Sequence, residues 1–344
     1  MESRILLIYT GGTIGMKQDP ETLLLKPFNF RQITQEVPEL RKFGFLIDSY
    51  SFDPVIDSSD VKPAFWVRLA ELIESSYDAY DGFVVLHGTD TMAYSASALS
   101  FMLENLEKPV IFTGSQLPIG MLRTDGKENL ISAIELAASA DADGHPYVPE
   151  VCVYFESQLY RGNRTVKYNA ENFRAFRSAN FPVLADVGIH VKYDMEYVRH
   201  PKVWGRKLKV HKKLDTNVAV LKIFPGITPQ HVLAVLSIPG LKAVILETYG
   251  SGNSMADGWF LDAVHDFTLN GGIAVNVTQC QAGSVDMAAY ANGAVLKDAG
   301  VISGYDITTE SALAKMFYLL GRYRSPDKVK EVFGRNLRGE ISKN

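Results

Sequence analysis

Short apolar runs alternate with helix-like segments along most of this chain, and this alternation constrains its fold more than any other feature. Continuous apolar runs are typical of strands buried on both faces of a parallel sheet, whereas the segments between them repeat their apolar residues at helical spacing. Chains with this order form α/β folds, in which helices cover the sheet. We therefore predict two α/β domains, each a mainly parallel sheet flanked by helices, with a larger N-terminal and a smaller C-terminal domain.

The N-terminal domain is predicted over 1–190. Its strands are predicted at Ile5–Tyr9, Gly82–Leu86, Pro109–Thr113 and Val151–Phe155. Its helices are predicted at Pro63–Ser75, Met92–Asn105 and Thr124–Ser139. From Gly188 to Thr216 periodicity fades and Lys, His and Tyr become dense, so we predict a connecting segment over 191–215 with no strand or helix.

The C-terminal domain is predicted over 216–344, where the alternation starts again. Its strands are predicted at Val218–Phe224, Lys242–Leu246 and Ile273–Val277. Its helices are predicted at Thr228–Leu236, Asp257–Asn270 and Thr308–Tyr323.

Composition excludes several classes of protein. A chain of 344 residues with 47% hydrophobic and 22% charged residues is typical of a globular protein, and a net charge of -4 without long runs of one sign argues against a nucleic-acid partner. No apolar run approaches the roughly 20 residues of a membrane helix, and the first strand follows Met1 too closely for a signal peptide. We expect a cytoplasmic protein in which Cys152 and Cys280 are buried free thiols.

Two strand-to-helix turns carry the polar residues of greatest interest. Thr10–Gly15 follows the first predicted strand and displays Thr13, whereas Leu86–Thr91 follows the second and displays Thr89 and Asp90. Such turns lie at the carboxyl edge of a sheet, where open α/β folds bind ligands. Asp57–Asp60 and Arg161–Lys167 add further hydroxyl and basic groups. In a closed site, a hydroxyl group can act as a nucleophile when a nearby lysine acts as its general base.

Other common chemistries lack their motifs. The seven histidines never fall at i, i+4 on one helix and no Cys-x-x-Cys occurs, so no metal site is predicted. No Gly-x-Ser-x-Gly elbow is present, and Gly126-Lys127-Glu128 lacks the hydroxyl residue of a P-loop. Thr10 stands where a dinucleotide fingerprint needs its first glycine, so no cofactor is predicted. Singly, the threonines, glycines and Lys167 could be helix caps, turn residues and a solvated lysine; their combination favours threonine-based chemistry.

Thr10–Met16 and Leu86–Met92 resemble the two signature motifs of the bacterial-type L-asparaginases. Four further segments are similar to the cytoplasmic type I branch of that family: Gly114–Gln116, Arg161–Lys167, Tyr249–Asn253 and Asn336–Glu340. The resemblance extends through both predicted domains, nearly from end to end.

The resemblance implies hydrolysis of L-asparagine to L-aspartate and ammonia without a cofactor. Thr13 is then the nucleophile that forms a β-aspartyl enzyme, and Thr89, Asp90 and Lys167 activate the water that releases aspartate; which threonine attacks first stays open. Ser58, with Asp57 and Ser59 beside it, is implied to hold the substrate α-carboxylate, while Asp90 also takes the α-ammonium. Backbone amides near Gly12, Gly88 and Thr89 receive the oxyanion. Asn253 of a second subunit closes the site, which implies a homodimer or homotetramer.

Two departures from the type I pattern are evident. The mobile segment after the first motif usually has a tyrosine that contacts the first threonine, but Lys17–Phe30 has none and Leu23–Leu25 occupies its place. Val166 and Glu247 replace a threonine and an arginine that bind activating asparagine in some members, although Cys280 is kept. Because a carboxylate repels the carboxylate of such a ligand, we predict that asparagine does not activate this enzyme.

Two other functions remain open on sequence alone. The first is an amidase acting on glutamine or on aminoacyl-tRNA; glutamine differs by one methylene, which a pocket distinguishes by only about 1–3 kcal/mol. The second is a non-catalytic amino-acid sensor on the same fold, although a sensor has little need of both threonines. The asparaginase to glutaminase ratio and the choice between dimer and tetramer are not predicted.

Overall fold

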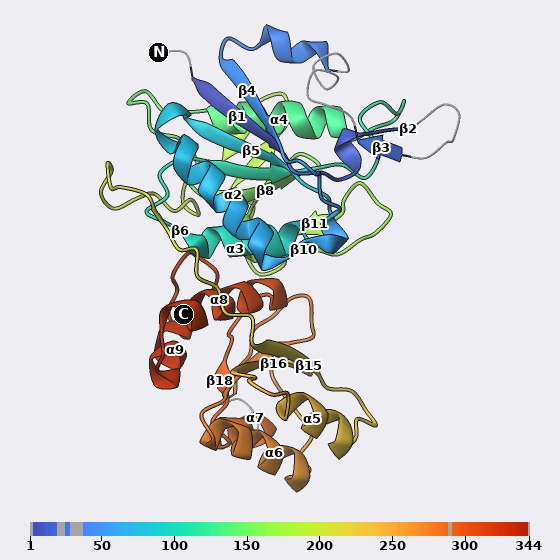
Figure 1. Cartoon of the computed structure of the whole chain (residues 1–344), viewed down its shortest axis with the longest axis vertical. Coiled ribbons are helices and arrows are strands. Elements are labelled where there is room, and N and C mark those ends of the chain that lie inside the picture. The colour runs from blue at the N-terminus through green and yellow to red at the C-terminus, as the bar shows by residue number, and fades with distance from the viewer. Residues whose placement is uncertain (1–2, 19–24, 28–36, 288–290, 343–344) are drawn as a thin grey trace. The chain divides into compact units, whose positions relative to one another are not determined.

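The computed structural model describes residues 3–18, 25–27, 37–287 and 291–342. The chain divides into two compact units, Met1–Lys212 and Lys213–Asn344, each of which is described by itself (Figure 1). The predicted class is confirmed, because both units are built on mainly parallel sheets flanked by helices. The boundary between the units lies within the segment predicted to connect two domains.

The first unit contains an eight-stranded sheet of order β13-β12-β9-β8-β7-β5-β1-β4. Five adjacent strands run parallel to one another: β4 (Leu46–Ser51), β1 (Arg4–Tyr9), β5 (Gly82–Leu86), β7 (Val110–Thr113) and β8 (Val151–Phe155). Antiparallel strands extend one edge: β9 (Gln158–Arg161), β12 (Ala185–Val187) and β13 (Val191–Tyr193). The parallel arrangement brings the loops after β1, β5 and β7 to the same edge of the sheet.

Helices cover this sheet because the parallel strands β1, β5, β7 and β8 are buried on both faces. Helix α4 (Gly126–Ala138) buries Leu130 and Ile134 in one core with alternate residues of β1, such as Ile5 and Leu7. Helices α2 (Pro63–Ser76) and α3 (Met92–Met102) pack against each other, and α3 also packs on β8 (Figure 1). Nearly every residue of α3 is buried, as expected for a helix of apolar and small residues without charged side chains.

The predicted helix 92–105 is too long. The α3 helix ends at Met102, and Leu103–Glu104 forms a short strand, β6, that pairs with β14 (Lys209–Val210). Asn105 has a φ of 62°, a left-handed conformation that asparagine tolerates better than most residues and that is incompatible with a continuing helix. The tertiary pairing with β14 therefore overrides the local preference for helix.

The prediction of a segment without strands over 191–215 is also wrong, since β13 and β14 lie inside it. These strands have three and two residues, and each exists only through a partner elsewhere in the unit, β12 or β6. Strands this short give no periodicity that a sequence pattern can reveal. Two further pairs of short strands were also not predicted: β2 (Met16–Gln18) with β3 (Leu25–Pro27), and β10 (Val166–Lys167) with β11 (Phe176–Arg177).

The second unit contains a parallel sheet of order β15-β16-β17-β18. Its strands are β15 (Val218–Lys222), β16 (Ala243–Thr248), β17 (Ile273–Thr278) and β18 (Ile302–Ser303). Its helices are α5 (Pro229–Leu236), α6 (Gly258–Leu269), α7 (Ala291–Asp298), α8 (Thr309–Arg322) and α9 (Pro326–Phe333). The core joins Leu221, Val244 and Leu246 of the sheet to Phe260 and Val264 of α6.

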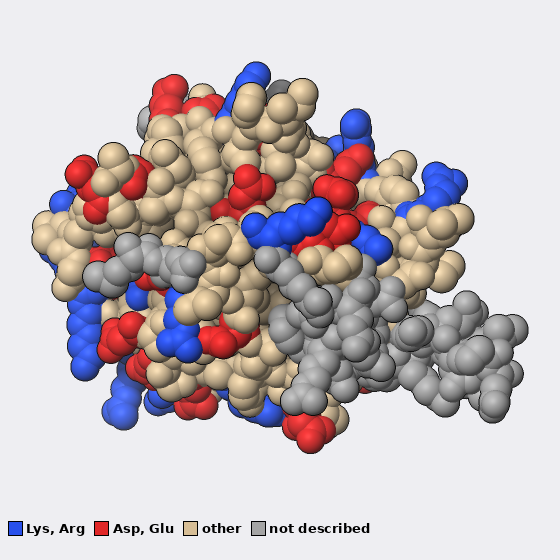
Figure 2. Space-filling view, turned by 90° about the horizontal axis from the view of Figure 1, so that it is seen from above, with Lys and Arg blue, Asp and Glu red and all other residues tan. Residues whose placement is uncertain are grey.

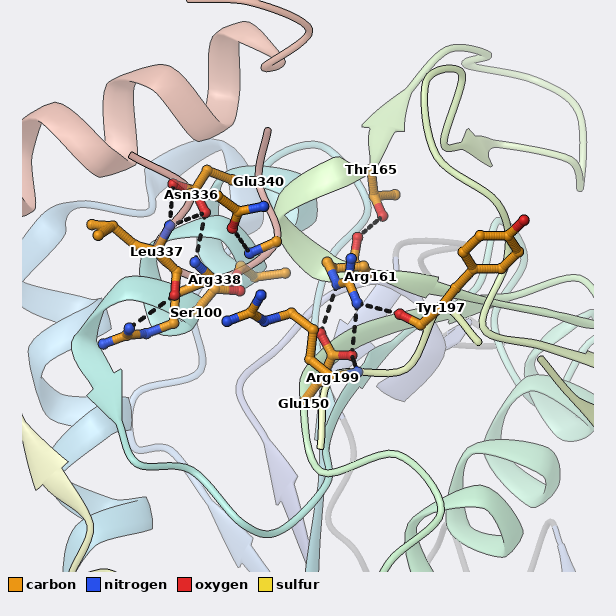
Figure 3. A network of polar contacts seen from close by, with 12 residues as sticks. Ser100, Glu150, Arg161, Thr165, Tyr197, Arg199, Asn336, Leu337, Arg338 and Glu340 are labelled. Carbon is orange, nitrogen blue, oxygen red and sulfur yellow. Dashed lines mark hydrogen bonds and ion pairs between the residues drawn. The ribbon is translucent and has the colours of Figure 1, made fainter. Parts of the chain in front are cut away.

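The Asn336–Glu340 segment serves the fold of the second unit. Lys315 of α8 is fully buried, pairs with the equally buried Glu340 and donates hydrogen bonds to the carbonyl oxygens of Phe333 and Arg335 at 2.7 Å. Glu340 in turn accepts from the backbone amides of Leu337 and Arg338 (Figure 3). Because Lys315 bonds both to Glu340 and to the carbonyls of Phe333 and Arg335, the C-terminal segment is fixed to α8.

The two cysteines differ in exposure. Cys152 is buried in β8 as predicted, but Cys280 is exposed, which corrects the prediction for it: β17 ends at Thr278, so Cys280 lies in the following loop. Within the described parts of the chain, no helix combines the length and apolar character needed to span a membrane. Figure 2 shows acidic and basic side chains interspersed on the face it presents.

Candidate active site

Three loops meet where β1 and β5 end. The backbone amide and the hydroxyl of Thr10 both donate to the carbonyl of Leu86, and the amide of Ile56 donates to the carbonyl of Thr10. A Cβ added to Gly12, whose φ is +89°, would lie 2.4 Å from the amide nitrogen of Gly88. A Cβ added to Gly88 would lie 2.4 Å from Oγ of Ser58. The structure therefore brings the Gly12, Gly88 and Ser58 segments together at a distance that only glycine permits.

Thr13 begins a short 3-10 turn, Thr13–Gly15, directly after Gly12. The turn is held in place by Tyr9, whose buried hydroxyl donates to the carbonyl of Gly15 at 3.0 Å. Burial raises the pKa of Tyr9 to about 12, so the phenol stays protonated and keeps donating. A Cβ at Gly15 would overlap the Tyr9 ring at 2.3 Å. Thr13 is itself half-buried and stands next to the contact between Gly12 and Gly88.

Thr89, Asp90 and Lys167 are in direct contact. Nζ of Lys167 lies 2.8 Å from Oγ1 of Thr89 and 2.7 Å from Oδ1 of Asp90. The Lys167 side chain is mostly buried, with 18% exposed, whereas 60% of the Asp90 side chain is exposed. Lys167 reaches this position from β10, 77 residues away from Asp90 in the sequence. The carboxylate is thus paired with the lysine and still accessible to a ligand.

Gln116 is a site residue that sequence reasoning did not include. The Thr89 hydroxyl donates to Oε1 of Gln116 at 3.3 Å, and Nε2 of Gln116 donates to the carbonyls of Ala170 and Asn172 at 3.1 Å. Because an ammonium group can only donate, Thr89 accepts from Lys167 and directs its own hydrogen to Gln116. The signal was its place directly after β7, at the same sheet edge as Thr13 and Thr89.

Asp125 fixes Gln116 in turn. Its carboxylate accepts from the backbone amides of Gln116 and Leu117 at 3.0 and 3.1 Å. Asn129 of α4 donates to the same carboxylate and to the carbonyl of Gly114. The Gly114–Gln116 segment is therefore held in place by groups at the start of α4.

Asp57, Ser58 and Ser59 form the third loop of the site. Asp57 caps a short 3-10 turn, Ser58–Asp60, and accepts from the backbone amide and the hydroxyl of Ser59 at 2.9 and 2.8 Å. Both bonds lower the pKa of Asp57, the backbone bond most. Ser58 is buried, its carbonyl accepts from the Thr91 hydroxyl at 2.6 Å, and its side chain lies against Gly88. Of the three, Ser58 is the residue placed against the Gly12–Gly88 contact.

His87 is buried in the core and contacts the loop that carries Thr89. Its Nδ1 lies 2.7 Å from the carbonyl oxygen of Gly88, so that nitrogen carries the hydrogen. Its Nε2 then accepts from the Ser95 hydroxyl at 3.0 Å, and Ser95 accepts from Nε1 of Trp66 at 2.9 Å. Burial lowers the pKa of His87 to about 4. The residue is a neutral structural histidine, and its hydrogen bond fixes the peptide plane between Gly88 and Thr89.

The depressed pKa of His87 predicts an acid-sensitive fold. The unfolded chain binds a proton at this residue below pH 6.5, whereas the folded protein resists until about pH 4. The stability that this residue contributes is therefore fully present above pH 6.5 and is lost as the pH falls toward 4, by about 3 kcal/mol at about 1.36 kcal/mol per pKa unit. Urea unfolding across this range measures the loss, and His87→Asn, which cannot titrate, should flatten the slope. An equally steep slope in the variant would assign the effect to other groups.

Asn253 lies in the second unit, in a turn that starts at Tyr249. The backbone amides of Tyr249 and Asn253 each donate to the other residue's carbonyl, at 2.9 and 2.8 Å. Gly252 has a φ of +105°, and Nδ2 of Asn276 donates to its carbonyl at 2.9 Å. The turn is thus rigidly held from β17, and Asn253 does not belong to the loops of the first unit that carry Thr13 and Thr89.

The positions linked to activation by asparagine have partners of their own. Glu247 accepts from the Thr309 hydroxyl at 2.7 Å and lies 3.9 Å from Nζ of Lys222. Val166 pairs with Arg177 across β10 and β11. The other departure, the lack of a tyrosine in 17–30, falls largely on residues 19–24 and 28–30, which lie outside the described residues, and Leu23 and Leu24 are among them.

A group with the geometry of a metal site occurs away from the threonines. Among the described residues, Asp141, Asp143 and His145 place ligand atoms within 4.8 Å of one another in the loop after α4. The carboxylate of Asp141 already accepts from the backbone amides of Asp143 and His145 at 2.9 Å. None of the three belongs to the threonine site.

Comparisons with known proteins cover both units. Residues 4–199 match the family model described as "Asparaginase, N-terminal", and residues 217–333 match the "Glutaminase/Asparaginase C-terminal domain". The chain is 43% identical over 342 residues to L-asparaginase 1 of Escherichia coli K12, covering 98% of each chain. It is 41% identical to the 60 kDa lysophospholipase of Mus musculus, covering 99% of this chain and 63% of that protein. The crystal structure of L-asparaginase I from Vibrio cholerae matches over the full length of both chains, with a TM-score of 0.90 and 41% identity.

Proposed function

The chain belongs to the asparaginase family, and from this premise we propose how its residues perform the family's reaction. It is an L-asparaginase, which hydrolyses L-asparagine to L-aspartate and ammonia. We assign the catalytic roles to Thr13, Thr89, Asp90 and Lys167. The observation that carries this assignment is the contact of Lys167 with both Thr89 and Asp90, at 2.8 and 2.7 Å, beside the loop that holds Thr13.

In the first half-reaction the Thr13 hydroxyl attacks the side-chain amide carbon of L-asparagine. The carbonyl oxygen becomes an oxyanion, and the backbone amides near Gly12 and Thr89 stabilise it; one such donor contributes about 3–4 kcal/mol in comparable sites. The proton that the Thr13 hydroxyl gives up passes to the amide nitrogen, and when the tetrahedral intermediate collapses the carbon–nitrogen bond breaks and ammonia leaves. The product is a β-aspartyl ester on Thr13. His87 supports this step because it orients the peptide that carries the Thr89 amide.

In the second half-reaction a water molecule hydrolyses that ester. Thr89, Lys167 and Asp90 form a hydrogen-bonded set through which the proton of the attacking water moves. Gln116 accepts the Thr89 hydrogen, so the hydroxyl must turn from Gln116 toward the site when it relays a proton. Aspartate then leaves and Thr13 regains its hydrogen.

Substrate orientation follows from the charges around the threonines. Asp90 is sufficiently exposed to pair with the α-ammonium of asparagine while it contacts Lys167. Ser58 is placed to donate to the α-carboxylate, and Asp57 keeps the Ser59 hydroxyl and amide directed toward itself. Gly12 and Gly88 let the two loops approach closely, which keeps Thr13 and Thr89 near each other for one substrate.

The remaining assignments concern the assembly and its surroundings. We propose a homodimer or homotetramer in which Asn253 of a second copy closes the site. The rigid turn at Tyr249–Asn253 supports a role in recognition, because a fixed turn presents a side chain at little entropic cost. The resemblance to the cytoplasmic type I branch favours a cytoplasmic enzyme that acts on free L-asparagine and needs no cofactor, nucleic acid or membrane.

The other two functions are weaker. An amidase acting on aminoacyl-tRNA needs a surface that attracts phosphate, whereas this chain has a net charge of -4. A sensor needs no contact between a buried lysine and a threonine hydroxyl, because that contact prepares proton transfer and not binding.

The rate of ammonia release across a wide range of L-asparagine concentrations tests this function and its regulation together. We expect a hyperbolic curve, because Glu247 is held by Thr309 and carries the same charge as a substrate carboxylate. A sigmoidal curve would agree with asparaginase activity but would refute the prediction that asparagine does not activate the enzyme. Ammonia release from glutamine but not from asparagine would assign a different substrate. No ammonia from either would refute the proposed chemistry.

A further inference from the structure

A buried ion pair lies at the start of the segment that carries Lys167. Nε and Nη2 of Arg161, at the end of β9, donate to the two carboxylate oxygens of Glu150 at 2.6 and 2.9 Å (Figure 3). Only 3% of the Arg161 side chain and 8% of the Glu150 side chain are exposed. The bidentate geometry leaves this pair a single arrangement.

Neighbouring groups complete the pair. Nη2 of Arg161 also donates to the carbonyl of Tyr197 at 2.6 Å, and the backbone amide of Arg199 donates to Glu150 at 2.7 Å (Figure 3). The guanidinium lies over the Phe181 ring, 4.4 Å from its centroid. Three separate segments of the first unit, at Glu150, at Phe181 and at Tyr197–Arg199, are therefore tied to the ion pair.

The turn after Arg161 transmits this anchor to the catalytic strand. Residues 162–164 form a buried 3-10 turn, and Thr165 closes it, because its amide bonds to the Gly162 carbonyl and its hydroxyl donates to the Arg161 carbonyl at 2.8 Å. Thr165 is fully buried. Lys167 follows two residues later, on the two-residue strand β10, where its backbone pairs with Phe176 of β11.

A contribution to folding stability does not by itself explain why a buried ion pair occurs at this position. Removing two charges from water costs free energy that their attraction often fails to recover, and apolar replacements are frequently neutral or stabilising. Geometry is a stronger reason, because Nζ of Lys167 must lie within hydrogen-bond distance of both Thr89 and Asp90. Displacing a reacting group by about 1 Å lowers a rate by about 10²-fold.

We propose that the Arg161–Glu150 ion pair, acting through the Thr165 hydroxyl, positions Lys167 for its contacts with Thr89 and Asp90. Arg161, Glu150 and Thr165 are positioning residues, since they touch neither Thr89 nor Asp90 in the structure. This inference rests on the proposed role of Lys167 in the hydrolysis of asparagine.

Thr165→Val tests the proposal, because valine has nearly the same shape but cannot donate to the Arg161 carbonyl. We expect kcat to fall by about 10- to 100-fold with little change in KM, and Thr165→Ser, which keeps the hydroxyl, to restore most of kcat. Ile73→Ala is the control for lost stability: Ile73 is fully buried in α2, so this variant should lower the melting temperature and keep kcat. Glu150→Gln removes the charge at constant shape and is a second, independent test. It should give the same fall in kcat with little change in KM, and it replaces Thr165→Val if that variant folds poorly.

The same substitution in a Lys167→Met background separates positioning from general damage. If Thr165 acts through Lys167, then Thr165→Val should not lower the residual rate any further. An additive loss in the double variant, or wild-type kcat in both Thr165→Val and Glu150→Gln, would overturn the proposal. Failure of the proposed function is distinguishable, because wild-type protein and Lys167→Met would then release ammonia at equal rates.

Discussion

Replacing Thr13 by valine should lower kcat for L-asparagine by about 10⁴-fold or more, which is the size of effect seen when a catalytic nucleophile is removed. Valine keeps the branched shape of threonine but has no oxygen to form the β-aspartyl ester. Thr13 follows Gly12, and the turn that holds it is fixed by Tyr9 and Gly15, so the fold should tolerate the change. Steady-state ammonia release measures kcat, and the melting temperature checks the fold.

Thr13→Ser is the matched control for this variant. Serine keeps the nucleophilic oxygen and removes only the methyl group, so a substantial part of kcat should remain. The Thr13 assignment is refuted if Thr13→Val retains kcat within about tenfold of wild type, since a route without this hydroxyl would then carry the reaction.

Replacing Thr89 by valine should lower kcat by about 10³-fold or more, because proton transfer by a positioned group contributes about 10²- to 10⁴-fold. Thr89 is the group between Lys167 and Gln116, and valine breaks both hydrogen bonds. The salt bridge from Lys167 to Asp90 does not involve the hydroxyl and should persist. Binding of L-asparagine, measured by calorimetry, should therefore weaken much less than kcat.

The comparison between rate and affinity also separates an enzyme from a sensor. A sensor would lose little in Thr89→Val, since its output is binding, and the loss of kcat with retained affinity would exclude that function. Thr89→Ser serves as the control that keeps the oxygen between Lys167 and Gln116. Wild-type kcat in Thr89→Val would contradict the role of the hydroxyl, whereas equal losses in the serine and valine variants would show that the methyl group is needed as well as the hydroxyl.

Much of the fold was predictable because its strands are buried on both faces. The runs at 82–86 and 151–155 were predicted with their observed ends, since an apolar run bounded by polar residues marks the full length of a buried strand. The helix from Pro63 was predicted from its proline start, and it ends at Ser76. The loops that carry Thr13 and Thr89 followed from the same pattern, because parallel strands end at one edge.

The rest depended on tertiary contacts that leave no local trace. Strands β13 and β14 are too short to show a period, and α3 ends early because β6 pairs with β14. Cys280 follows an apolar run but lies beyond the end of β17, where burial stops. Gln116 was within a segment noted for its resemblance, but its contact with Thr89 exists only once β5 and β7 are neighbours.

Glycine contacts explain why the site depends on specific backbone positions. Gly12 and Gly88 approach so closely that any side chain at either position would meet the opposite loop. Thr13 and Thr89 are the next residues along the two loops, so this approach sets how far apart their hydroxyls lie. Lys167, in contrast, reaches Thr89 from a separate hairpin, which is why its position needs an anchor of its own.

The most direct test of the central claim is to identify the residue that becomes acylated. Thr89→Val should still form the β-aspartyl ester but hydrolyse it slowly, so the variant should be quenched after mixing with L-asparagine and its peptides mapped by mass spectrometry. We predict an aspartyl adduct on the peptide that contains Thr13, together with release of about one equivalent of ammonia per site before turnover slows. An adduct on another residue, or ammonia release at the variant's steady rate with no adduct and no initial burst, would contradict it.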